Sequence, residues 1–249
     1  MDIPSVLSIA GSDPSGGAGI QADLRVFSAL GVYGMAIPAI LTAQNTLGVQ
    51  QVQLTDAAFL RAQLEVLLAD ITPSAIKIGA LGGAELVETV ADSLCDYTGP
   101  IVVDPISIAS SGAPLLDSAG LQMLAKKLIP KSTIITPNLE EWITLKPLLQ
   151  QQPPYVLVTG GTNTGTIRDS LHGPEGTLCW QHEAIDTKNT HGTGCSLSSA
   201  IASQLALGHS VPQACELAIE FVTLALMRSK DLQLGHGKGG LIYTPELCR

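Results

Sequence analysis

Charge is scarce in this chain of 249 residues, since Asp, Glu, Lys and Arg together make up 14% of it. An average soluble domain contains about 25% of these residues. Hydrophobic residues make up 45%, which is enough for a sizeable core, so the low charge does not indicate disorder. The length fits one large α/β domain or two small ones.

Basic residues are fewer than acidic ones. The chain has 13 Lys and Arg against 22 Asp and Glu, which gives a net charge of −9. An acidic surface repels phosphate backbones, which argues against a nucleic-acid partner. No uninterrupted apolar run reaches the ~18–20 residues of a membrane-spanning helix. The segment Met1-Asp2-Ile3-Pro4 does not show the basic region followed by an apolar stretch that is typical of a secretory signal peptide. We therefore expect a cytoplasmic protein without a membrane partner.

Cysteine is also sparse and irregularly spaced. The five residues are Cys95, Cys179, Cys195, Cys215 and Cys248. Their number is odd and no CxxC motif is present, which argues against a disulfide framework and against a zinc ribbon.

Short β-branched runs alternate with longer helical stretches along the chain. Strands are predicted at Ser5–Ala10, Val32–Leu41, Ala75–Ile78, Ile101–Asp104, Thr133–Thr136 and Tyr155–Val158. Helices are predicted at Ala18–Leu30, Asp56–Asp70, Ala84–Tyr97, Ser118–Lys127, Cys195–Leu207 and Val211–Ser229. Thr166–His172 and Thr177–His182 flank a Gly-Pro-Glu-Gly turn, which indicates a hairpin. The pattern predicts a three-layer α/β fold, with a mostly parallel central sheet flanked by helices and an antiparallel edge hairpin.

Polar and glycine-rich segments follow the predicted strand ends. They are Gly11–Gly19, Gly79–Gly83, Asp104–Gly112, Pro137–Glu141 and Gly160-Gly161. Ligands of parallel sheets bind beyond the carboxyl ends of the strands, so we expect the functional groups to gather on one rim.

The turn His191-Gly192-Thr193-Gly194-Cys195 precedes a predicted helix. Gly192 and Gly194 allow close approach of a ligand to the backbone, and the free N–H groups of a helix start attract anions such as phosphate. A helix N-terminus lowers a thiol pKa, so Cys195 could act as a base on a substrate hydroxyl. The alternative is a helix-entry loop with a small buried cysteine. No GxxxxGK[ST] motif is present.

A second glycine-rich segment, Gly11–Gly19, follows the first strand. Its spacing does not match GxGxxG, so a dinucleotide site is not indicated. Asp23, just inside the following helix, could meet a substrate or could be a solvated helix carboxylate.

Four polar residues lie at other strand ends. Gln44 offers a donor and an acceptor, which suits the edge of a heterocycle. Asp104 and Glu141 could hold Mg²⁺ through water. Asn138 and Glu141, three residues apart at a helix start, also fit a reciprocal cap pair.

Two further chemistries are compatible with the residue types. Cys179, His182, His191 and Cys195 have spacings that a zinc site could use. Cys195 and His191 could form a nucleophile and base of a hydrolase, although no third orienting group is evident.

Taken together, these segments resemble the hydroxymethylpyrimidine/phosphomethylpyrimidine kinases of thiamine biosynthesis, in the ribokinase-like superfamily. The resemblance covers nearly the whole chain. It is carried by Ala10–Leu24, Phe27–Met35, Leu41–Gln50, Lys77–Gly79, Val103–Pro105, Ser111-Gly112, Leu115-Leu116, Ile135–Leu139, Ile185–Cys195 and Ser198–Ala202.

The resemblance implies a single ribokinase-like domain over residues 1–249 that uses ATP and Mg²⁺. It implies phosphorylation of 4-amino-5-hydroxymethyl-2-methylpyrimidine to its monophosphate and then to its diphosphate. Carried over by position, the catalytic residues are Cys195, as base, with Gly192, Thr193 and Gly194 as the anion hole. Substrate-binding positions are Gly11, Asp23, Gln44, Ala80 and Ser107. ATP and phosphate positions are Asn138, Thr159, Lys188 and His191, and metal positions are Asp104 and Glu141. Relatives of this kind are commonly homodimers.

The chain departs from the family pattern around this rim. Ala80 replaces a usual Met, Ser107 and Ser110 lie where Met and Lys are usual, and Thr159 replaces a usual Lys. Ala80 and Ser107 would leave the ring pocket wider and more polar. Lys188 remains, with Mg²⁺, to offset phosphate charge. Two alternatives therefore stay open: a pyridoxal kinase of the same subfamily, and a pyrimidine-binding protein with weak catalysis.

Overall fold

The computed structural model describes residues 3–109, 112–163 and 165–243, so the predictions that involve Ser110, Ser111 and Cys248 lie outside the described residues. The strands are β1 (Ser5–Ser12), β2 (Tyr33–Asn45), β3 (Gly48–Leu54), β4 (Ala75–Ile78), β5 (Ile101–Val103), β6 (Ile134–Ile135), β7 (Tyr155–Asn163), β8 (Thr166–Gly173) and β9 (Gly176–Glu183). The α-helices are α1 (Gly19–Ala29), α2 (Ala57–Asp70), α3 (Ala84–Ser93), α4 (Ser118–Met123), α5 (Leu139–Leu145), α6 (Thr193–Ala206) and α7 (Val211–Ser229). Short turns of other helix types follow α4 (Leu124–Leu128 and Ile129–Lys131) and α5 (Lys146–Leu148).

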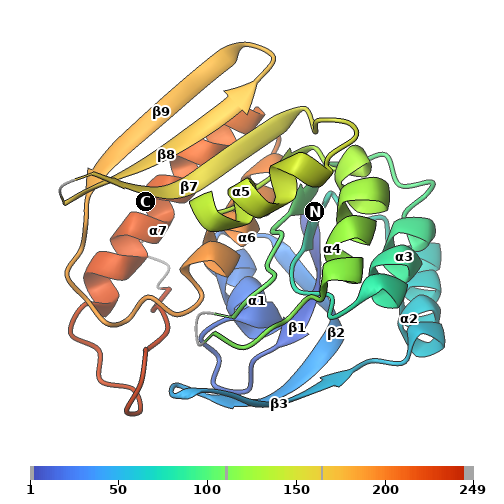
Figure 1. The fold of residues 1–249 in the computed structure, drawn as a ribbon, viewed down its shortest axis with the longest axis horizontal. Coiled ribbons are helices and arrows are strands. Elements are labelled where there is room, and N and C mark those ends of the chain that lie inside the picture. The colour runs from blue at the N-terminus through green and yellow to red at the C-terminus, as the bar shows by residue number, and fades with distance from the viewer. Residues whose placement is uncertain (1–2, 110–111, 164, 244–249) are drawn as a thin grey trace.

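These strands form one sheet in the order β3-β2-β1-β4-β5-β6-β7-β8-β9. The pairs from β2 through β1 to β7 are parallel, whereas β2–β3, β7–β8 and β8–β9 are antiparallel. Figure 1 shows β3 and the β8–β9 hairpin at opposite ends of the sheet. The predicted parallel centre and edge hairpin are confirmed.

Helices cover both faces of the sheet (Figure 1). One hydrophobic cluster joins the sheet to α2, α3 and α5, and a second joins it to α1, α6 and α7. Alternation along β5 explains this division, because Ile101 and Val103 belong to the first cluster while Val102 belongs to the second. The three-layer prediction is therefore confirmed.

The second antiparallel edge was not expected from the sequence. β3 is a strand of seven residues whose last five are exposed, and it pairs with the far half of β2. Its Gln-rich, exposed sequence lacks the apolar run that the buried strands show. β2 and β7 are also longer than predicted, because each continues past the parallel centre into an antiparallel pair.

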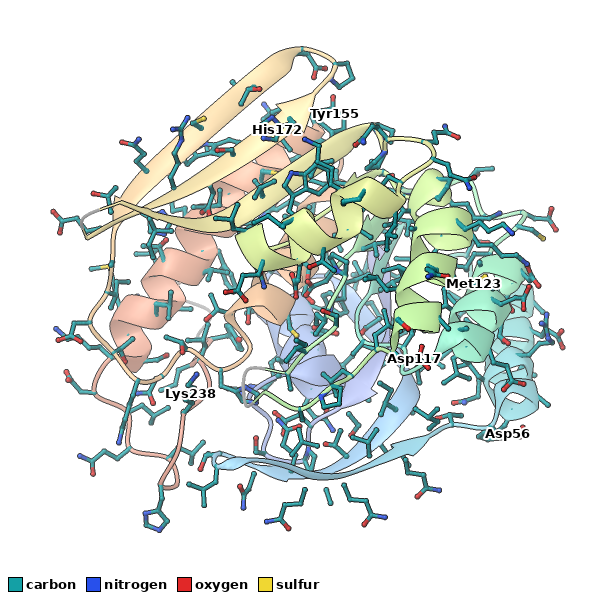
Figure 2. The ribbon with its side chains drawn as sticks, viewed as in Figure 1. Asp56, Asp117, Met123, Tyr155, His172 and Lys238 are labelled. Carbon is teal, nitrogen blue, oxygen red and sulfur yellow. The ribbon has the colours of Figure 1, made fainter. Side chains whose placement is uncertain are left out.

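Side-chain caps fix where several helices begin. Asp56 accepts a hydrogen bond from the Phe59 N–H at the start of α2, and Asp117 accepts one from the Gly120 N–H at the start of α4 (Figure 2). Asn138 and Glu141 form the reciprocal pair expected at α5, with both bonds 2.9 Å long. The cap-pair alternative for these two residues is therefore confirmed.

Candidate active site

A cavity of about 590 Å³ lies beyond the carboxyl ends of the parallel strands, a volume in the usual range for a small-molecule site. The structure brings most of the predicted site residues to its wall. They are Gly11, Gln44, Ala80, Asp104, Ser107, Asn138, Glu141, Thr159, His191, Gly192, Thr193, Gly194 and Cys195. The expected gathering on one rim is thus observed for these thirteen residues.

The turn before α6 depends on Gly192. This residue has a left-handed φ of 79°, and a Cβ atom built on it would lie 1.9 Å from the Gly17 carbonyl oxygen. Only glycine fits such a position. The two glycine-rich segments therefore pack backbone against backbone, and the N-terminus of α6 opens into the cavity as an anion-attracting wall.

Cys195 lies on the cavity wall and is largely buried. Burial raises the pKa of its thiol to about 12, while the Lys77 charge opposes the rise and the Asp104 and Asp23 charges add to it. The expectation of a lowered thiol pKa is therefore wrong. Loss of water around the sulfur outweighs the favourable position at a helix start.

Asp23 does not line the cavity, which corrects the expectation that it contacts a substrate. It has no exposed surface, and both of its oxygens lie 2.9 Å from the Lys77 ammonium. Ser8 and Ser199 donate further hydrogen bonds to its carboxylate, at 2.6 and 2.7 Å. Asp23 is instead the centre of a buried ion-pair network beneath the cavity floor.

Lys77 is one of the cavity residues that the sequence did not single out, as are Asp13 and Thr42. It is fully buried in β4, next to the cavity, and its pKa nevertheless stays high. Burial favours the neutral amine, but the Asp23 charge, helped by Cys195 and Asp104, outweighs that effect. The signal was present in the sequence: a lysine within the otherwise apolar strand Ala75–Ile78 requires a buried carboxylate.

Asp104 and Glu141 are two of the four carboxylates that line the cavity, the others being Asp13 and Glu140. Burial raises the pKa of Asp104 to about 6, against the Lys77 charge and a 3.2 Å hydrogen bond from Ser198 Oγ. Burial and the Asp104 charge raise the pKa of Glu141 to about 8. Two carboxylates that disfavour each other's ionisation form an environment that suits a divalent cation.

The ring of His191 packs on Gly17, where a Cβ atom would lie 2.4 Å from the His191 Cδ2 atom. His191 Nε2 lies 2.8 Å from Asp13 Oδ2 and 3.1 Å from the Gln44 amide. The other end of that amide lies 3.2 Å from Thr42 Oγ1. A polar chain from Asp13 to Thr42 thus passes through two predicted site residues.

Lys188 is exposed and does not line the cavity, so the structure does not place it where its predicted role requires. Among the described residues that line the cavity, Lys77 is the sole lysine and no arginine is present.

The zinc and hydrolase alternatives find no support in the geometry. Within residues 3–109, 112–163 and 165–243, no three His, Cys, Asp or Glu side chains are grouped to hold a metal ion. Cys179 lies on the outer hairpin, where its sulfur accepts a 3.0 Å hydrogen bond from Arg168. His191 Nε2 is engaged by Asp13 and Gln44.

The fold and the cavity define a ribokinase-like kinase of small molecules. The chain belongs to the phosphomethylpyrimidine kinase family, whose model matches residues 13–241. This confirms the resemblance inferred from the motifs.

Relatives with assigned activities agree with this placement. The chain is 40% identical to a hydroxymethylpyrimidine/phosphomethylpyrimidine kinase of Streptomyces coelicolor, over 95% of this chain and 93% of that protein. It is also 40% identical to a thiamine biosynthesis multifunctional protein of Corynebacterium glutamicum, over 95% of this chain but only 33% of that longer protein.

Solved structures show the same fold. A phosphomethylpyrimidine kinase of Clostridium difficile has a TM-score of 0.78 and 37% identity, over 90% of this chain and 100% of that one. A pyridoxal kinase of Staphylococcus aureus in complex with pyridoxal has a TM-score of 0.87 and 26% identity, over 98% of this chain and 94% of that one.

Proposed function

We propose that this chain transfers the terminal phosphoryl group of ATP to the hydroxymethyl group of 4-amino-5-hydroxymethyl-2-methylpyrimidine, and then phosphorylates that monophosphate. The observation that carries the proposal is the meeting of a heterocycle-sized cavity, an anion-attracting turn and Cys195 on one rim. Membership of the phosphomethylpyrimidine kinase family supports the choice of substrate.

Different parts of the cavity wall would bind the ring, the transferred phosphoryl group and the phosphates of ATP. Gly11, Gln44, Ala80 and Ser107 would surround the ring, and Gly192, Thr193 and Gly194 would stabilise the transferred phosphoryl group. Asn138 and Thr159, which form an isolated bridge between the α5 start and β7, would face the phosphates of ATP. Phosphoryl transfer relies mostly on such positioning and charge stabilisation.

Cys195 would accept the proton of the substrate hydroxyl. Because burial disfavours its thiolate, the cysteine needs nearby positive charge to act as a base, and Lys77 supplies it from below.

Asp104 and Glu141 would hold Mg²⁺, directly or through water. Burial raises the pKa of both carboxyls, and a bound divalent cation would offset that effect by favouring their ionised forms. When bound, Mg²⁺ neutralises charge on the phosphate oxygens of ATP.

The proposal is tested by an ATP-consumption assay with the purified chain, Mg²⁺ and hydroxymethylpyrimidine, followed to both phosphorylated products. We expect turnover, and we expect Cys195→Ala to lower kcat by about 10²–10⁴, the usual scale for loss of a general base. Cys179→Ala, on the exposed hairpin, is the matched control and should leave kcat unchanged. A folded protein without turnover at saturating substrate would contradict the proposal.

Pyridoxal is the second candidate substrate. The high structural similarity to a pyridoxal kinase and the small side chain at Ala80 favour testing it. Comparing kcat/KM for the two substrates in competition decides between them. Tight pyrimidine binding in calorimetry without phosphoryl transfer would instead favour a binding protein.

We also propose that residues 1–249 form one domain, which the single continuous sheet supports, and that the protein is a cytoplasmic homodimer. Exposed apolar side chains on β2, in the turn after it and on β3, at Leu41, Leu47 and Leu54, offer a surface for a second copy. The described cysteines are free, which suits a reducing compartment. No helix of the described residues is long and apolar enough to span a membrane. Sedimentation of the purified chain would give the oligomeric state.

A further inference from the structure

Gln44 lies between Thr42 and His191. The other hydrogen bonds of these two residues determine whether each can donate a hydrogen bond to Gln44 or accept one from it. One terminal atom of its amide lies 3.2 Å from Thr42 Oγ1, and the other lies 3.1 Å from His191 Nε2. The oxygen and nitrogen of an amide have nearly the same shape, so the partners decide which end is which.

Thr42 must be an acceptor toward Gln44. A hydroxyl carries a single proton, and that of Thr42 is donated to the Ser12 carbonyl oxygen at 2.8 Å. The two lone pairs of Thr42 Oγ1 can accept hydrogen bonds, but the hydroxyl has no further proton to donate. The Gln44 atom beside Thr42 is therefore the amide nitrogen.

His191 must be a donor at Nε2. Its partner Asp13, 2.8 Å away, is an acceptor whose two oxygens already receive hydrogen bonds from Ser15 N–H, Ser15 Oγ and Ala18 N–H, at 2.7–2.9 Å. Burial raises the pKa of Asp13, but hydrogen bonds from His191 and Ser15 outweigh it and lower that pKa, so the carboxylate, already held by donors on both oxygens, is ionised and has no proton to give. Nε2 therefore carries the proton, whether the ring is neutral or charged.

His191 fixes the other end of the Gln44 amide. An amide nitrogen facing a protonated Nε2 would bring two donors together at 3.1 Å, whereas the amide oxygen can share the Nε2 hydrogen with Asp13 in a three-centre hydrogen bond. With the oxygen toward His191 and the nitrogen toward Thr42, both contacts are satisfied. With the opposite orientation, neither is.

We propose that Asp13, His191 and Thr42 are positioning residues that lock the Gln44 amide in this orientation, so that Gln44 recognises a ring by a fixed order of donor and acceptor. After these two bonds the amide keeps one oxygen lone pair and one N–H, side by side, for a ligand in the cavity. The inference rests on the proposed function, which places a pyrimidine ring against Gln44.

A fixed order selects a chemical class of ring. A 4-aminopyrimidine presents an N–H donor next to an acceptor ring nitrogen. The 4-oxo analogue in its lactam form presents a carbonyl acceptor next to a ring N–H, which is the reverse order. A glutamine amide that can rotate by 180° can hydrogen-bond to either ring. An amide held in one orientation hydrogen-bonds to one ring and places donor against donor and acceptor against acceptor with the other.

The experiment compares the dissociation constants of the 4-amino substrate and its 4-oxo analogue by calorimetry. For the parent protein we expect a preference for the amino ring on the order of 10²–10⁴, because the 4-oxo ring leaves two polar pairs in the site mismatched. The double variant Asp13→Ala/Thr42→Val removes both constraints, because alanine leaves Nε2 without its acceptor, so the ring can donate or accept toward Gln44, and valine offers the amide no acceptor. The preference should then fall to about tenfold or less.

Kinetics give a second measurement. Because Gln44 acts on the ring and not on the reacting atoms, Thr42→Val should raise KM for the amino substrate while kcat changes by less than about threefold. Ser15→Ala is the matched control: it removes one bond to Asp13 but keeps the carboxylate, and Ser15 does not line the cavity. It should retain the full preference.

The outcomes separate the inference from the function on which it rests. A parent protein that binds neither ring would contradict the proposed function. A parent protein that prefers the amino ring, together with variants that keep the same preference, would overturn the locked amide. If the double variant does not fold, Thr42→Val alone must lower the preference, and an unchanged ratio there overturns the inference equally. Binding without turnover still tests the lock, because the dissociation constants do not depend on catalysis.

Discussion

At the scale of single residues, the centre of the molecule is organised around a charge pair that no solvent reaches. Lys77 and Asp23 both have no exposed surface, and each ammonium–carboxylate contact is 2.9 Å long. Removing water from two charges costs several kcal/mol per ion, so such a pair is stable only with good geometry and further hydrogen bonds. Ser8 and Ser199 supply those bonds to Asp23.

Lys77→Met is therefore expected to destabilise the protein by about 3–5 kcal/mol, since it leaves a buried carboxylate without its partner. Urea denaturation measures the loss. Lys77→Met/Asp23→Asn removes both charges and should recover most of it, because no uncompensated ion remains. Lys126→Met, at an exposed lysine, is the control and should change stability by less than about 0.5 kcal/mol. Equal losses for the single and double variants would show that the pairing of charges is not the cause.

The site residues could be predicted from the sequence where their role follows from local chain position. Gly192 and Cys195 lie at a helix start, and Asp104 follows β5, while Gln44 follows the shorter strand that the sequence predicts. The structure brings all four to one cavity. The pKa of Cys195 and the position of Asp23 could not be predicted. Both depend on burial by segments distant in sequence, and Lys77 is 54 residues from Asp23.

At the scale of elements, the start of α6 is built by contact between two glycine-rich segments. The left-handed Gly192 lies against the Gly17 backbone, and Gly17 in turn gives room to the His191 ring. The anion-attracting turn therefore depends for its shape on the first glycine-rich segment, which is far from it in the sequence.

We expect Gly192→Ala to lower kcat/KM by on the order of 10² or more, because displacing the proposed phosphoryl-binding turn by about 1 Å carries that cost. Its Cβ atom would overlap the Gly17 oxygen, and its φ of 79° is strained for alanine. Gly208→Ala is the matched control, since Gly208 has a similar φ of +91° but faces open space. It should cost stability only, by about 1 kcal/mol, with kcat/KM unchanged. Comparable kinetic losses in both variants would point to backbone strain alone.

Element types and most boundaries could be predicted because they follow from apolar periodicity and from local caps. β3 could not, because its exposed strand carries no apolar pattern and is held by pairing with β2. The extension of β7 that pairs with β8 could not be predicted either, for the same reason.

At the scale of the whole molecule, the acidic cavity couples stability to pH. The pKa of Glu141 is raised from 4.5 to about 8, so the folded protein binds this proton more tightly than the unfolded chain. A carboxyl with a raised folded pKa favours folding below about pH 4.5, and its contribution is lost as the pH rises toward 8. The slope from one group cannot exceed about 1.4 kcal/mol per pH unit.

Without metal, the parent protein should therefore lose more thermal stability between pH 5 and pH 8 than the Glu141→Gln variant, as measured by calorimetry. Glutamine keeps the cap on α5, because it can still accept the Asn138 N–H. Mg²⁺ should raise the Tm of the parent more at pH 8 than at pH 6, since protons compete with the cation for the carboxylates. Glu216→Gln, at an exposed position, should keep the parent slope. A parent and a Glu141→Gln variant with the same pH dependence would contradict the prediction.

The layered α/β fold and thirteen of the residues that line the cavity follow from short-range patterns, namely strand–helix alternation, glycines at turns and polar residues at strand ends. The family follows from the resemblance of the ordered motifs. The folded structure was needed to show that Asp23 supports the cavity from below, that the Cys195 thiol is hard to ionise, and that Gln44 is held between His191 and Thr42. The physical reason is that burial, charge proximity and hydrogen-bond partners are set by segments far apart in the chain, such as Asp13 and His191, 178 residues from each other.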